Sequence, residues 1–79
     1  MTVQVKLFAL LRKHHPGPNR SAPLSTALSE GSTIADLIAE LRLPADVVRA
    51  SFVNGEKLPP GTVLHDGDLV SLFSAVVGG

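Results

Sequence analysis

The last two residues of the sequence, Gly78 and Gly79, are the residues whose type and position best suit chemistry. They follow an apolar, β-type run over residues 69–77, so they cap no helix and complete no turn. Because glycine lacks a Cβ, such an end can slide through a narrow channel and present its carboxylate in a pocket of another protein. The alternative is a frayed chain end, since termini are often poorly ordered. The dipeptide alone does not decide between these interpretations.

Few other residues suggest a reactive site. The sequence has no cysteine, which excludes disulfides, thiolate zinc ligands and an internal thiol nucleophile. The side chains of His14 and His15 diverge because they are neighbours, and with His65 they indicate loop histidines, so we expect no metal site. Asp66 and Asp68 flank a glycine before an apolar run, which favours a turn over an acid–base pair.

The composition is typical of one small globular domain. The chain has 79 residues, of which 44% are hydrophobic, and we expect a single domain over residues 1–79. Seven basic and seven acidic residues cancel and are interspersed, so neither nucleic acid nor an anionic membrane is an expected partner. The start of the chain has no signal-peptide pattern and no apolar run approaches about 18 residues. We therefore expect a soluble, cytoplasmic protein.

The first half of the chain predicts a hairpin followed by a helix. Residues 2–11 alternate and predict a half-buried strand whose inward side chains are Val3, Val5, Leu7 and Ala9. Residues 12–23 are rich in turn formers and predict an irregular loop, and residues 24–28 predict a short return strand. Ser32 or Thr33 can cap a helix with Asp36 as a weak capping box. The apolar positions of that helix are Ile34, Leu37, Ile38 and Leu41.

The second half predicts a tight hairpin and a last strand. Pro44 is expected to end the helix, and residues 44–48 to form a helical turn. Residues 51–53 and 56–58 read as strands around an Asn54-Gly55 turn, which serves as nothing more than a turn signature. Val63 and Leu64 are expected to be buried as a small apolar contribution to the core. In the last strand we expect Val70 and Leu72 to face inward, and Leu69, Ser71 and Phe73 to face outward.

This element order predicts an α+β fold of the ubiquitin-like β-grasp type. The last strand can lie beside the first in a mixed sheet of four to five strands, with one main helix packed across it. The final strand then delivers an extended tail, residues 75–79, that ends in the two glycines.

Several stretches of the chain resemble the ubiquitin-like sulfur carriers of the MoaD and ThiS family. Residues 5–12, VKLFALLR, are similar to the first strand of that family, and residues 31–37, GSTIADL, to the start of its helix. The spacing of Val53-Asn54-Gly55, of residues 64–70 and of the closing Gly78-Gly79 is more specific, because it fixes the tail relative to the last strand.

The resemblance implies a chemistry for the terminus. In the family, an ATP-dependent, ubiquitin-activating-like adenylyltransferase attaches AMP to the terminal carboxylate, and a persulfide sulfur then replaces the AMP to leave a thiocarboxylate. Carried over, Gly79 holds the reactive carbon and Gly78 allows its close approach. The chain then binds no cofactor, since the partner uses the ATP, and it is a co-substrate without a complete active site of its own.

The resemblance favours the small subunit of molybdopterin synthase, with the larger synthase subunit as a partner. The residues before the tail, 74–77, lack the prolines typical of the molybdopterin branch, whereas the long loop over residues 12–23 resembles that branch. A carrier for thiamine thiazole or cysteine synthesis therefore remains an alternative. So do a ubiquitin-like modifier joined to lysines through Gly79 and a β-grasp interaction module with an incidental tail.

Partner binding requires a docking surface and a tail that reaches. Phe8, Leu69 and Phe73 are the expected outward apolar residues for docking, the alternative being that they belong to the core. Val76 and Val77 are β-branched and favour extended backbone, so the tail loses less entropy when a partner binds it. Residues 75–79 can span at most about 16 to 18 Å, enough to enter a buried pocket.

Overall fold

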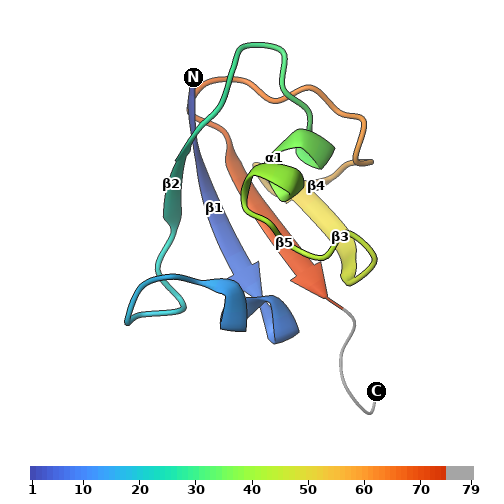
Figure 1. Cartoon of the computed structure of the whole chain (residues 1–79). Helices are drawn as coiled ribbons and strands as arrows, with labels where there is room; N and C mark the ends of the chain where they lie inside the picture. The colour runs from blue at the N-terminus through green and yellow to red at the C-terminus, as the bar shows by residue number, and fades with distance from the viewer. Residues whose placement is uncertain (75–79) are drawn as a thin grey trace.

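The computed structural model describes residues 1–74, so the predictions made for residues 75–79 lie outside the described residues. Within residues 1–74, five strands and one α-helix form the domain, together with a 3-10 helix, η1. In chain order the elements are β1 (Thr2–Phe8), η1 (Ala9–His14), β2 (Leu24–Ala27), α1 (Ile34–Glu40), β3 (Val48–Val53), β4 (Glu56–Lys57) and β5 (Leu69–Ser74). Figure 1 shows α1 lying across one face of the sheet, which confirms the predicted β-grasp.

The sheet is mixed, with the strand order β2-β1-β5-β3-β4. The central strands β1 and β5 are parallel, and every other neighbouring pair is antiparallel. Because β1 and β5 are parallel neighbours, β5 ends at the same end of the sheet as β1, opposite the N-terminus (Figure 1). The described chain therefore ends at one pole of the domain.

The core lies between the sheet and α1, as the alternation predicted. Its strand residues include Val3, Val5, Leu7, Val70 and Leu72, and α1 contributes Ile34, Leu37 and Ile38. Leu64 is also buried, but the prediction that Val63 joins it was wrong, because Val63 is 46% exposed. Val63 forms a β-bridge with Thr33, and the alternation of extended backbone then turns its side chain to the opposite side from Leu64.

The first strand ends earlier than predicted. Ala9 has a φ of 56° and lies exposed at the start of η1, so the expectation of an inward Ala9 in a strand over residues 2–11 was wrong. The backbone change at Ala9 breaks the alternation and brings Leu11 into the core, where it is fully buried. The segment expected to be an irregular loop thus begins with a helix that seals one end of the core.

The start of α1 is as predicted, and its capping box is complete. The Thr33 side chain accepts a hydrogen bond from the Asp36 N–H at 3.2 Å, and the Asp36 carboxylate accepts one from the Thr33 N–H at 2.9 Å. Two N–H groups that the helix itself leaves unsatisfied are therefore bonded. Of the two capping candidates, Thr33 is the N-cap.

The end of α1 differs from the prediction that Pro44 stops it. The helix ends at Glu40. Two residues later, Arg42 adopts a φ of 56°, and the Arg42 N–H donates to the Ala39 carbonyl. The Leu43 N–H donates to the Ile38 carbonyl at 3.1 Å, which completes a Schellman motif. Leu43 is buried, so an apolar contact ends the helix before the proline is reached.

Residues 45–47 form a turn, and β3 then begins at Val48, earlier than the predicted strand over residues 51–53. The buried Ser51 hydroxyl donates to the Leu58 carbonyl at 2.8 Å, which ties β3 to the segment after β4. The return strand β4 has only two residues, one fewer than the predicted strand over residues 56–58, although the Leu58 N–H still donates to the Ser51 carbonyl at 3.0 Å.

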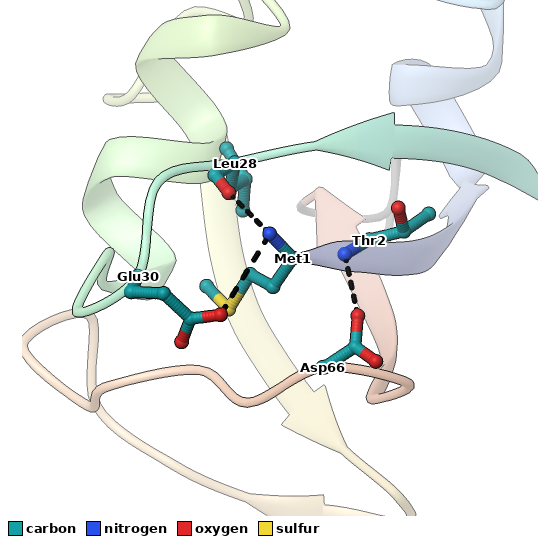
Figure 2. A network of polar contacts seen from close by, with 5 residues as sticks. All are labelled: Met1, Thr2, Leu28, Glu30 and Asp66. Carbon is teal, nitrogen blue, oxygen red and sulfur yellow. Dashed lines mark hydrogen bonds and ion pairs between the residues drawn. The ribbon is translucent and has the colours of Figure 1, made fainter.

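The start of β1 is held by several polar contacts (Figure 2). The Met1 amino group donates to the Leu28 carbonyl at 2.9 Å and lies 3.9 Å from the Glu30 carboxylate. The Thr2 N–H donates to the Asp66 carboxylate at 2.7 Å. The Asp66 carboxylate therefore joins the turn before β5 to β1, in agreement with the prediction that Asp66 belongs to a turn.

Asp68 and Asn54 form a second polar link, between the β3–β4 turn and the start of β5. The Asn54 side-chain amide donates to the Asp68 carboxylate at 3.0 Å, and its carbonyl oxygen accepts from the Leu69 N–H at 3.0 Å. Asp68 also accepts from the His65 N–H at 2.8 Å. The view of Asn54 as a turn residue only was therefore wrong, since its side chain also holds β5 in place.

Candidate functional site

The predicted tail residues, Val76, Val77, Gly78 and Gly79, lie outside the described residues. The described part of the candidate site is therefore the end of β5 and the sheet face that α1 leaves uncovered, called here the outward face. On the central strands its paired residues are Gln4, Lys6 and Phe8 of β1, and Leu69, Ser71 and Phe73 of β5. Ala50 and Phe52 of β3 extend it.

An aromatic cluster of Phe8, Phe52 and Phe73 occupies the outward face. The rings of Phe8 and Phe73 stack with centroids 4.4 Å apart and 8° between their planes. Phe52 meets Phe73 edge-on, with centroids 5.4 Å apart. All three side chains are half-buried, because they cover one another while α1 lies on the other face of the sheet (Figure 1). Such an apolar surface on a small domain is a candidate docking site.

The predicted docking residues do not all lie together. Phe8 and Phe73 are paired neighbours near the end of β5, as the prediction required. Leu69 is outward and 39% exposed, but it pairs with Gln4 at the start of β5, away from the Phe8 and Phe73 pair. The outward face thus has an aromatic end next to the tail and an aliphatic end remote from it.

Phe52 was missed as a docking residue. The predicted strand over residues 51–53 included it, and alternation between the buried Ser51 and Val53 gives the signal that places it outward. What the sequence did not show is which strand neighbours β5. Once β3 pairs with β5, Phe52 lies opposite Ser71 and contacts Phe73.

Two cations lie close to the aromatic cluster. The Lys6 ammonium and the Arg12 guanidinium each lie 5.8 Å from the centre of the Phe8 ring, within the range of cation–π attraction. Lys6 comes from β1 and Arg12 from η1, so η1 adds charge to this end of the outward face. An apolar partner surface with acidic groups at its rim would complement this arrangement.

Within residues 1–74, no group of three or more histidine, aspartate or glutamate side chains could hold a metal ion. His15 is buried, and its Nδ1 accepts from the Gly17 N–H at 2.9 Å while Nε2 donates to the Ala22 carbonyl at 2.9 Å. This histidine organises the loop before β2. No helix in the same part of the chain is long and apolar enough to cross a membrane.

The sequence matches the model of the ThiS family over residues 5–79. The chain belongs to the ThiS family. With the β-grasp fold, this membership makes it a ubiquitin-like sulfur carrier of the ThiS and MoaD type, as the resemblance implied. None of the curated protein sequences matches the chain significantly.

Solved structures support this placement. SAMP1 of Haloferax volcanii has a TM-score of 0.75 at 24% identity, and the match covers 100% of both chains. A putative molybdopterin converting factor subunit 1 of Pyrococcus furiosus has a TM-score of 0.72 at 26% identity, covering 95% of this chain and 98% of that one. A structure of the complex of subunits 1 and 2 of the Helicobacter pylori molybdopterin-converting factor has a TM-score of 0.62 at 26% identity, and the match covers 100% of both chains.

Proposed function

We propose that this sulfur carrier is the small subunit of a cytoplasmic molybdopterin synthase. The observation that carries the proposal is the likeness to molybdopterin converting factor subunit 1 from two organisms, over 95% or more of this chain. One of those structures is a complex with subunit 2, which supports a larger synthase subunit as the partner of this chain.

The proposed chemistry takes place at the carboxylate of Gly79. A carboxylate resists nucleophiles, so a partner adenylyltransferase first transfers AMP from ATP to it and releases pyrophosphate. The terminal sulfur of a partner persulfide attacks the acyl carbon and displaces AMP, which gives an acyl disulfide between the two proteins. A thiol then attacks the partner's sulfur, so that a new disulfide forms and the thiocarboxylate is released. Because this chain has no cysteine, both the persulfide and the thiol come from other molecules. Gly78 lets the terminus enter the narrow adenylation centre.

Docking in this proposal uses the outward face. The aromatic cluster binds an apolar surface of the partner, Lys6 and Arg12 meet acidic groups at its rim, and Leu69 extends the contact toward the far end of β5. Val76 and Val77 bias the tail toward an extended backbone that passes into the pocket of the partner. Docking near the end of β5 places the start of the tail next to the partner.

A deletion strain tests the pathway. Cells that lack this chain should lose molybdopterin, and the wild-type chain should restore it while a variant without Gly79 should not. A strain that keeps its molybdopterin and instead requires thiamine or cysteine would contradict the proposal and assign the carrier to one of those pathways. Protein conjugates of higher mass that disappear with Gly79, in cells whose molybdopterin is normal, would indicate a modifier.

A further inference from the structure

The end of β5 is held by an element that is distant in sequence. The Ser74 hydroxyl accepts a hydrogen bond from the Leu10 N–H at 2.9 Å, and Ser74 is only 6% exposed. Ser74 also pairs with Val48 of β3. The last described residue of β5 is therefore held on one side by β3 and on the other by η1.

The Leu10 N–H is available for this bond because of its place in η1. The first N–H groups of a helix have no partner inside the helix, and the residue before η1, Phe8, provides no side-chain cap. At Ala9, whose φ is positive, the chain leaves the extended conformation of β1 and enters η1. The Ser74 hydroxyl thus caps a helix to which it does not belong, and that helix in turn fixes Ser74.

The residue before Ser74 is held on the opposite face of the sheet. Phe73 stacks on Phe8, which is the residue that precedes η1. Consecutive residues of β5 are therefore held from both faces by one continuous segment, residues 8–10: the outward face through the rings and the inward side through the hydroxyl. The last two described residues of β5 are therefore held from both faces of the sheet.

We propose that Ser74 is a positioning residue, whose bond to the Leu10 N–H fixes the end of β5, and that adenylation of the Gly79 carboxylate depends on this fixed end. The inference rests on the proposed function, since it concerns delivery of the Gly79 carboxylate to the adenylation centre. Every residue after Ser74 is attached to the end of β5, so a shift of that end changes the point from which the last five residues, with a maximum span of about 16 to 18 Å, must reach the adenylation centre. A misplacement of about 1 Å can lower a rate by about 100-fold.

The test is adenylation of this chain by the ATP-dependent adenylyltransferase of the same cells, followed by pyrophosphate release. For Ser74→Ala we expect kcat to fall by about tenfold or more, while KM for the carrier changes by less than about twofold, because the docking residues are intact. Amide exchange at Leu10 should be slow in the wild-type chain and faster in the variant. A general loss of stability would not produce this split between kcat and KM.

Ser51→Ala is the matched control, because it also removes a buried, hydrogen-bonded serine hydroxyl in the same sheet. It should leave kcat and the Leu10 amide unchanged. If Ser74→Ala does not fold, Ser74→Thr and Ser74→Val give an isosteric pair that differs in the hydroxyl, and only Thr should retain the wild-type kcat.

The proposal is overturned if the Leu10 amide exchanges freely in the wild-type chain. It is equally overturned if loss of the hydroxyl releases that amide without lowering kcat, or if Ser74→Thr and Ser74→Val are equally slow. A wild-type chain that the adenylyltransferase does not adenylate at all would instead refute the proposed function, independently of Ser74.

Discussion

Replacing Phe8 by alanine distinguishes docking from folding on the outward face. The ring is half-buried against Phe73, so its removal should cost about 0.8 to 1.5 kcal/mol of hydrophobic free energy, roughly half the value for full burial. Loss of the stacking adds about 1 kcal/mol. No sealed cavity forms because the face is open. We expect the free energy of unfolding to fall by about 2 to 2.5 kcal/mol and Tm to fall by roughly 10 to 20 °C.

Leu72→Ala is the control, since Leu72 is fully buried on the opposite face of the adjoining strand. Its truncation should destabilise by about 2 to 5 kcal/mol, comparable with or greater than the effect of Phe8→Ala. Urea unfolding gives both values. Titration calorimetry with the larger synthase subunit, below both unfolding transitions, should show affinity weakened about 30-fold by Phe8→Ala, equivalent to about 2 kcal/mol. Leu72→Ala should bind like the wild-type chain.

Two results would refute this reasoning. If folded Phe8→Ala bound the larger subunit with wild-type affinity, the aromatic cluster would not be the docking site. If Phe8→Ala were unfolded at 25 °C while Leu72→Ala was folded, Phe8 would belong to the core and the outward face would be a structural layer.

Three further substitutions, one of them with a matched control, test the fold that supports the site. Leu11→Ala should lower the free energy of unfolding, measured in urea, by about 2 to 5 kcal/mol, because it leaves a cavity at a fully buried position. The control Leu10→Ala, at an exposed side chain of the same helix, should cost under about 1 kcal/mol. Equal effects of the two substitutions would contradict the role of η1 in closing one end of the core. Thr33→Ala should cost about 1 kcal/mol, visible as a lower Tm, and an unchanged Tm would mean that the capping box is dispensable. Asn54→Ala should cost about 1 to 2 kcal/mol and accelerate amide exchange at Leu69, and an unaffected Leu69 amide would contradict the link that Asn54 provides to β5.

The sequence predicted the fold where one periodicity dominates. Val3, Val5 and Leu7 alternate with polar residues, and Ile34, Leu37 and Ile38 keep to one helical face, so the type and the inward face of these two elements were predicted correctly, although their ends were not. The hairpin signature after Val53 and the turn before Leu69 placed the remaining strands. Local signals suffice in these segments because burial and propensity favour the same structure.

The errors fall where contacts distant in sequence determine the backbone. Nothing in the alternation predicts that Ala9 takes a positive φ, since alanine does not favour it. The gain lies in burial of Leu11, which becomes possible only when the sheet and α1 have formed a core to receive it. The end of α1 is similar, because Arg42 takes the left-handed conformation that glycine normally provides in order to bury Leu43.

The sequence predicted the residues of the candidate site better than it predicted the contacts between them. The chemistry of Gly78 and Gly79 was inferred from their position and from family resemblance, and strand parity identified Phe8 and Phe73 as outward residues. The stacking of those two rings required the parallel pairing of β1 with β5. The contact between Leu10 and Ser74 joins residues 64 positions apart, and no local pattern marks either residue as a partner of the other.

The most direct test of the central claim is intact mass spectrometry of the protein purified from its own cells. A sulfur carrier should show a fraction about 16 Da heavier, because one sulfur replaces one oxygen, and fragmentation should locate the change at Gly79. An unmodified carboxylate that persists after incubation with ATP, a sulfur donor and the activating enzymes of the cell would contradict the thiocarboxylate chemistry.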